Sequence, residues 1–363
     1  MRSVWWWAAG MLALALSGCL ESNPQPSPEA AGGKGLPGGG RNEEPADVGW
    51  TAQEADATLG PSPETWSGKD GPADPGWMDG GGTPFLGPSL GGLSIASERW
   101  VGMQWGPTPA SWIFGTFFAT PVFPFIGPLH TSNFFMQVAA QEGGCVVLAS
   151  AQAPCDKPCA FPEVCVSGQC VKWPEPFSVG DIEVKGLSTG QEVLLEKGPY
   201  PGVYYNTTPL PFGLFTHQSL VTVSASGGDL PWFIALVPGV EELSTSWDED
   251  FVLRLRDDED LVVTWVPPAT PASIRLVVGG PNLCHGCPPA GQLVCTAADT
   301  GTLTVPASLV SQLPGIVPEE LCLHYDCGFS YIERRNCSVV ATEPAAYEVC
   351  VASRVYFKSE HVK

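Results

Sequence analysis

Leu220-Val221-Thr222-Val223-Ser224-Ala225-Ser226-Gly227-Gly228 alternates apolar with polar side chains and then ends in two glycines. A repeat of two residues puts the apolar side chains on one face of a β-strand, and the glycines supply a turn after it. The same pattern predicts further short strands at residues 178–185, 192–196, 231–237, 251–256, 261–266, 273–278 and 302–305. Short strands at such close intervals are typical of an antiparallel β-sandwich, so the predicted fold class is mostly β.

The flanking segments extend this prediction. Residues 112–118 and 122–126 are rich in aromatic side chains, but Gly115, Pro121 and Pro124 interrupt the apolar run. This predicts buried strands and turns rather than a membrane helix. Further strands are predicted at residues 134–140, 145–149, 321–325, 330–334 and 347–357. One short helix is predicted at residues 306–313, because a proline suits the first turn of a helix.

The overall composition supports short strands and excludes some partners. The chain has 363 residues with 42 Gly and 37 Pro, and only 15% of residues are charged, which disfavours long helices. The formal net charge is −21. Such an acidic surface is repelled by phosphate groups, which argues against nucleic-acid binding and against a polybasic membrane contact.

The N-terminus carries a targeting signal. An apolar run from Val4 to Leu16 follows Arg2, and it is too short to span a membrane. Leu16-Ser17-Gly18-Cys19 resembles the lipobox of bacterial lipoproteins, although an ordinary signal peptide with a chance cysteine is the alternative. The resemblance implies that residues 1–18 are removed and that Cys19 is acylated. Because Asp does not follow Cys19, it also implies anchoring in the outer membrane, facing the cell surface or the periplasm.

The domain layout follows from changes in composition. Of the 73 residues 20–92, 28 are Gly or Pro, so residues 19–92 are predicted to form a lipidated, disordered tether. Residues 93–154 are predicted to hold the first β segment and residues 155–172 a disulfide knot. Residues 173–363 are predicted to hold the sandwich region with Cys-rich hairpins near its end.

The thirteen cysteines indicate an oxidising compartment, and twelve remain for disulfides once Cys19 is lipidated. Cys145 and Cys295 are predicted to form a bridge between two sheets. A nested pairing is predicted at the C-terminus, with Cys327–Cys337 inside Cys322–Cys350. Cys284-His285-Gly286-Cys287 departs from the haem-attachment order and is predicted to form a disulfide, within its loop or to a neighbouring strand.

Cys155, Cys159, Cys165 and Cys170 form a C-x3-C-x5-C-x4-C cluster. Two disulfides are predicted there, with a four-thiolate zinc site as the alternative. Sequence alone allows three pairings. The spacing resembles small cysteine-rich knots of extracellular modules, and that resemblance implies Cys155–Cys165 and Cys159–Cys170.

The whole layout is similar to that of large surface lipoproteins of myxobacteria. The similarity rests on segments 142–145, 182–187, 221–228 and 299–307, together with the cysteine cluster and Cys295. It covers most of residues 140–315. It implies the architecture and the location, and it implies no chemistry.

No sequence motif predicts a catalytic site. Gly186-Leu187-Ser188-Thr189-Gly190 matches the nucleophile elbow of hydrolases, but the residues after it predict a strand where that elbow needs a helix. The match at residues 87–91 lies in the tether. The five histidines lack metal-ligand spacing. A pair of carboxylates for glycoside hydrolysis stays an open alternative, because the separation of the two groups depends on the fold. Tyr200, Tyr204, Tyr205 and Trp232 are expected to lie in the core rather than to stack on sugars.

Two acidic runs flank residues 251–256 and could bind calcium through clustered carboxylates. The weak calcium candidates are Asp248, Asp250, Asp257, Asp258 and Asp260. Solvated turns are the alternative, and no other cofactor or metal is predicted.

The sequence therefore predicts a lipid-anchored cell-surface protein with a structural or binding role. Contact with the membrane is expected through the lipid anchor alone. A protein or a glycan is the expected ligand, and an extracellular hydrolase of the serine esterase or glycosidase type is the alternative function.

Overall fold

The computed structural model describes residues 89–101, 108–122, 136–150, 160, 163–166, 169–172, 174–195, 202–248, 251–279, 291–313, 330–342 and 345–362. The predicted signal peptide, Cys19 and most of the predicted tether lie outside these ranges.

The described chain is mostly β-structure, as the strand pattern predicted. The strands are β1 (Ser89–Trp100), β2 (Ala110–Val122), β3 (Met136–Glu142), β4 (Cys145–Ser150), β5 (Glu163–Val166), β6 (Gln169–Lys172), β7 (Ile182–Lys185), β8 (Val193–Leu195), β9 (Val203–Tyr205), β10 (Leu220–Ala225), β11 (Phe233–Pro238), β12 (Val252–Leu255), β13 (Leu261–Thr264), β14 (Ser273–Gly279), β15 (Gly291–Ala298), β16 (Thr302–Val305), β17 (Ser330–Thr342) and β18 (Ala345–His361). The predicted helix is confirmed as α2 (Ala307–Val310), which follows Pro306.

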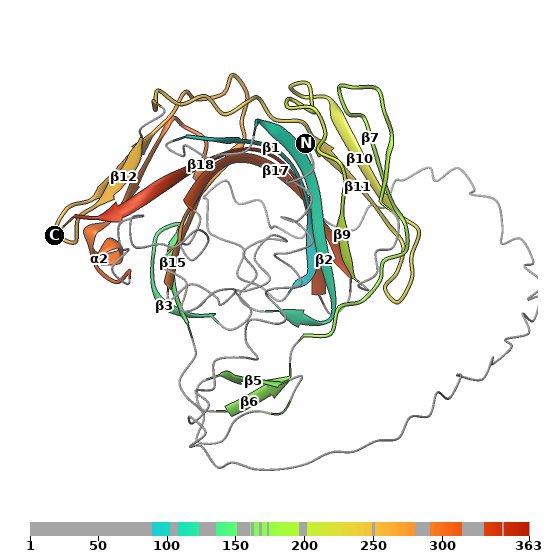
Figure 1. Ribbon diagram of the computed structural model, residues 1–363, viewed down its shortest axis with the longest axis horizontal. Helices are drawn as coiled ribbons and strands as arrows, with labels where there is room; N and C mark the ends of the chain where they lie inside the picture. The colour runs from blue at the N-terminus through green and yellow to red at the C-terminus, as the bar shows by residue number, and fades with distance from the viewer. Residues whose placement is uncertain are drawn as a thin grey trace, which may run out of the picture. The chain divides into compact units, whose positions relative to one another are not determined.

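Ten strands form one large sheet. Its order is β3-β4-β15-β14-β17-β18-β1-β2-β9, and β12 pairs with β18 beyond this path. The β1–β18 and β12–β18 pairs are parallel, while the remaining pairs are antiparallel. The long strands β17 and β18 curve together, with β1 beside β18 (Figure 1). Strands from residues 93–154 therefore share one sheet with strands from residues 173–363.

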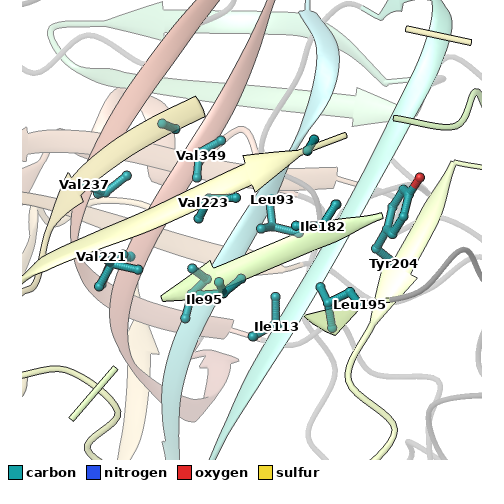
Figure 2. Close-up of a cluster of buried hydrophobic side chains, with 14 of the residues drawn as sticks. Leu93, Ile95, Ile113, Ile182, Leu195, Tyr204, Val221, Val223, Val237 and Val349 are labelled. Atoms are coloured by element: carbon teal, nitrogen blue, oxygen red, sulfur yellow. The ribbon is translucent and has the colours of Figure 1, made fainter. Parts of the chain in front are cut away.

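A four-stranded sheet, β11-β10-β7-β8, packs on one face of the large sheet. Figure 2 shows Ile182, Val221 and Val223 in front of Leu93 and Ile95, with the strands of the two sheets crossing. All five side chains are fully buried. The alternation that predicted β10 thus places its apolar side chains between two sheets, which is the predicted sandwich.

A second core lies on the large sheet where the β13–β16 pair and α2 pack. It includes Leu261 and Val263 of β13, Val305 of β16 and Leu309 of α2. They pack with side chains of β4, β12, β14, β15, β17 and β18. The other face of the large sheet buries a smaller cluster with Val146, Leu148 and Val277 among its members. Burial on both faces explains why strands such as β4 and β14 are rich in apolar side chains.

Strand β1 begins at Ser89, four residues before the predicted start of the first β segment at Leu93. Gly91 and Gly92 are the reason for the error, because paired glycines resemble the tether in composition. In the structure they lie between β2 and β18, where a Cβ on Gly91 would collide with the carbonyl oxygen of Thr116 and one on Gly92 with that of Glu348. Only glycine allows these strands to approach so closely.

The Cys145–Cys295 pairing is confirmed, with Cα atoms 4.0 Å apart. The prediction that it joins two sheets is wrong. The two cysteines are direct partners on adjacent strands β4 and β15 of the large sheet. A strand pattern shows which face a side chain occupies, but it does not show which strands are neighbours.

The nested C-terminal pairing is also wrong. Cys337 bonds to Cys350, which excludes both Cys327–Cys337 and Cys322–Cys350. The predicted strand stopped at Arg334, but β17 continues to Thr342 and places Cys337 directly opposite Cys350. Cys322 and Cys327 lie outside the described residues.

In the predicted knot, β5 and β6 pair and place Cys165 opposite Cys170, and Cys170 is disulfide-bonded. Cys155 and Cys159 lie outside the described residues, as do Cys284 and Cys287. The pairings implied for the knot and for residues 284–287 therefore stay predictions.

Candidate functional site

An open groove of about 620 Å³ lies between β12 and β13. Both strands line it, together with residues of the turn that joins them and with Ser246, Trp247 and Phe251. The two strands follow each other in sequence but do not pair. Each instead pairs on its far side, β12 with β18 and β13 with β16.

The backbone of β12 presents unpaired groups to this groove. Val362 donates its N–H to the carbonyl of Leu255, so the backbone groups of Leu255 and Leu253 point toward β18. Because direction alternates along a strand, the N–H and C=O groups of Val252 and Arg254 point the other way. No described backbone group bonds to them.

The facing edge of β13 has the same property. Trp265 donates to the carbonyl of Gly301, next to β16, so the backbone groups of Val262 and Thr264 point away from β16. Val266 points to the same side as these residues, and its N–H donates to the carbonyl of Ser244. This bond occupies the edge of β13 at its C-terminal end. Within the described ranges, Val262 and Thr264 have no backbone partner there. Two free strand edges therefore line one groove.

Apolar side chains line the groove beside these edges. Trp247 and Phe251 stack with ring centroids 4.2 Å apart, and both meet Phe357 of β18 edge to face. Leu253 and Val263 line the groove and are buried. The groove thus combines an apolar surface with backbone donors and acceptors on two sides.

The charged side chains at the groove form short-range pairs. Arg254 contacts Glu360 at 3.2 Å, and Arg256 contacts Glu259 at 3.3 Å. Both arginines are more than half exposed. These exposed pairs are screened by water and leave the guanidinium groups available to a ligand.

Of the calcium candidates, Asp260 lines the groove, and Asp257 and Asp260 have separate partners. Asp260 accepts a hydrogen bond from the N–H of Ala307 at 2.9 Å. Asp257 lies 3.6 Å from His361. Asp248 and Asp258 are described, but Asp250 is not. Among the described residues, the one group of three candidate metal ligands is Cys337, Glu348 and Cys350, so the described aspartates do not gather into a metal site.

A second constellation, which the sequence did not predict, is a buried ion-pair network on the smaller-core face of the large sheet. Arg354 contacts Glu98 at 2.6 Å and Glu333 at 2.7 Å. Arg335 contacts Glu348 at 2.9 Å and lies 3.9 Å from Glu333. The guanidinium of Arg354 also lies 4.8 Å from the ring centre of Tyr331.

The surroundings shift the pKa values of this network in different directions. Burial raises the pKa of Glu98 above its ordinary 4.5, and the opposing effect of Arg354 is smaller. Burial also acts to raise the pKa of Glu333. Arg354, Arg275 and Arg335 together lower this pKa by more than burial raises it, so it lies below 4.5. Burial raises the pKa of Tyr331 and Tyr356 as well. The network therefore stabilises the ionised form of Glu333.

A separate buried ion pair joins the large sheet to the layer above it. Arg334 is fully buried and contacts Asp299 at 2.6 Å. It also donates to the backbone carbonyls of Glu242 and Val266. Trp265 donates its indole N–H to the same Asp299. The described partners of Arg334 are one buried carboxylate and two backbone carbonyls, so we expect Arg334 to stabilise the fold.

The serine motif forms a hairpin turn, as predicted. Residues 186–190 connect β7 to β8, and the strand–turn–helix arrangement of a nucleophile elbow is missing at this site. Ser188 donates its hydroxyl to the carbonyl of Gly213. Ser188 is thus exposed and bonded to backbone, without a neighbouring histidine among the described contacts.

The aromatic predictions are partly confirmed. Tyr204 is buried, and its hydroxyl accepts a hydrogen bond from the N–H of Val179 at 2.9 Å. Trp232 is 70% exposed, so the prediction of a core position is wrong for this residue. It directly precedes β11, whose outward-facing side chains Ile234 and Leu236 are also exposed. Tyr200 lies outside the described residues.

Comparison of the chain with protein-family models, curated proteins and solved structures found no match. No helix in the described ranges is both long enough and apolar enough to cross a membrane.

Proposed function

We propose that this chain is a lipid-anchored cell-surface protein that binds an extended polypeptide segment in the groove between β12 and β13. The observation that carries the proposal is the pair of free strand edges that line one groove. An extended segment placed there would bond to both edges and add one strand between them, which is a recurring mode of peptide recognition.

The chemistry of the groove favours a polypeptide over other ligands. Backbone donors and acceptors on both sides match a chain that carries both groups at regular intervals. Alternate side chains of such a segment would face the buried Leu253 and Val263, and the others would face solvent. Arg254 and Arg256 are exposed cations in a chain of net charge −21. Glu259 and Asp260 also line the groove and balance these two charges, so a segment with little net charge is favoured.

The location rests on the sequence. The lipobox at residues 16–19 and the cysteine-rich composition support an exported, acylated protein. A segment on another surface or periplasmic protein is then the natural partner. Acylation can be tested by labelling cells with a palmitate analogue, where Cys19→Ser should abolish both the label and retention in the membrane fraction.

The groove can be tested with a random peptide library displayed on phage and selected on the purified full chain. We expect extended peptides with alternating apolar residues and little net charge. Val262→Pro removes an N–H that points into the groove and that β16 does not use, so it should weaken binding at least about tenfold while β13 stays folded.

Ile234→Pro is the matched control, because Ile234 is an equally exposed residue on the edge strand β11, away from the groove. The N–H of Gly239 donates to the carbonyl of Ser219, so every second residue before Gly239 bonds to β10. Ile234 lies between two such residues, and its backbone groups therefore point away from β10. If both proline variants bound the selected peptides as well as the unmodified protein does, the groove would not be the binding site.

A further inference from the structure

Cys337, Glu348 and Cys350 gather three metal-ligand atoms at one point of the large sheet. The two sulfur atoms and a carboxylate oxygen all lie within 4.8 Å of one another. The cysteines are direct partners on β17 and β18, and Glu348 lies two residues before Cys350 on the same face. In the described structure the two sulfurs form a disulfide.

Arg335 completes this cluster. Its guanidinium contacts Glu348 at 2.9 Å and lies 3.9 Å from the sulfur of Cys350. The guanidinium therefore lies beside both the carboxylate and one of the two sulfurs. Cys350 and Glu348 are buried, whereas Cys337 is only partly buried. The cluster is therefore reached from the side of Cys337.

We propose that the Cys337–Cys350 disulfide is the oxidised form of a metal site that binds one Zn²⁺-like cation when it is reduced. An external dithiol would attack the sulfur of Cys337, and the S–S bond would break with Cys350 leaving as a thiolate. The second thiol of the reagent would then release Cys337 and close a cyclic disulfide. The reagent is oxidised by two electrons, and the two cysteines are reduced by two.

The charges of the reduced site support a divalent cation. Within the cluster, two thiolates, one carboxylate, one guanidinium and one divalent cation sum to zero, which favours a buried site. The neighbouring Glu333 and Arg275 have opposite charges and lie 4.0 Å apart, so they leave this sum unchanged. Glu348 and Arg335 alone also balance in the disulfide form. Two sulfurs and one oxygen suit Zn²⁺, with a water as the fourth ligand. The disulfide form and the reduced, metal-bound form of the cluster would thus both be neutral.

The fold can keep its shape while this exchange takes place. β17 and β18 pair along their length from Ser330 to Thr342, so the strands stay joined without the disulfide. Cys145–Cys295 provides an internal comparison, because it also joins direct partners on adjacent strands. It is buried in the apolar second core, and no described carboxylate lies with it in a ligand group.

The test is a titration of the dithiol-reduced full chain with Co²⁺, followed by displacement with Zn²⁺. Thiolate–Co²⁺ absorption bands report sulfur ligands directly. The Cys337→Ser/Cys350→Ser variant should lose one equivalent of bound Co²⁺ relative to the unmodified protein. Other cysteines contribute equally to both, so the difference isolates this site. Glu348→Gln should keep the disulfide and weaken binding at this equivalent at least about tenfold.

Cys145→Ser/Cys295→Ser is the matched control and should retain the equivalent, with circular dichroism verifying that each variant is folded. Equal Co²⁺ stoichiometry in the Cys337→Ser/Cys350→Ser variant and the unmodified protein would overturn the proposal. Unchanged affinity in Glu348→Gln would also overturn it, because the carboxylate would not be a ligand.

Discussion

Arg354 contacts two carboxylates whose pKa values shift in opposite directions. The pKa of Glu333 is lowered by three arginines, so the folded protein stabilises its charge. The pKa of Glu98 is raised by burial, so the folded protein stabilises its neutral form instead. The two residues therefore contribute differently to stability, although both lie within 2.7 Å of one guanidinium.

Glu333→Gln should be strongly destabilising. The substitution leaves buried arginines without the charge that balances them, which costs about 3–5 kcal/mol when one partner of a buried pair is removed. Glu98→Gln should cost less than about 2 kcal/mol, because an amide still accepts a hydrogen bond from Arg354. Chemical denaturation measures both values.

Glu192→Gln is the control for this comparison. Glu192 forms an exposed pair with Lys185 at 3.6 Å, and an exposed pair contributes little. Its substitution should leave the denaturation midpoint unchanged. An equal loss of stability in Glu98→Gln and Glu333→Gln would show that the network does not distinguish the two carboxylates.

At the scale of elements, β1 holds a central position because it joins β18 on one side and β2 on the other. Gly92→Ala should loosen this contact, since the added Cβ collides with the backbone of Glu348. A backbone neighbour cannot move as a flexible side chain does, so we expect a loss of about 1–3 kcal/mol. Thermal unfolding of the full chain measures it.

Gly143→Ala provides the comparison for β1. Gly143 has a positive φ of 57°, but no atom lies within 4 Å of the position of an added Cβ. Its cost is that of the backbone conformation alone, about 1 kcal/mol. If Gly92→Ala were as stable as the unmodified protein, the close approach of β1 to β18 would not constrain residue 92.

The sequence predicted elements better than it predicted their partners. Alternation placed β10, β11 and β13 correctly, because a half-buried strand needs one apolar face. It could not show that β4 lies beside β15, since register and neighbours depend on the whole sheet. The groove was missed for the same reason, as adjacent segments 251–256 and 261–266 resemble a simple hairpin. The consecutive charges Glu333-Arg334-Arg335 at the end of the predicted strand 330–334 were the available signal for the buried networks.

At the scale of the whole molecule, stability should depend on pH through the two buried carboxylates with opposite signs. Because the folded-state pKa of Glu333 lies below 4.5, its contribution is present above that pH and is lost as pH falls through the lowered pKa. Because the folded-state pKa of Glu98 lies above 4.5, its contribution is present below that pH and is lost as pH rises through the raised pKa.

Denaturation of the unmodified protein and of both variants from pH about 3 to about 7 separates these contributions. Glu333→Gln should reduce the fall in stability on the acid side of 4.5, because the group that must be protonated is gone. Glu98→Gln should instead reduce the fall on the alkaline side of 4.5. The sign of the change in the pH dependence is the decisive result. Both residues are glutamates in one network, so opposite signs would separate the effect of desolvation on Glu98 from that of ion pairing on Glu333. Parallel pH profiles for both variants would mean that neither carboxylate is coupled to folding as the structure indicates.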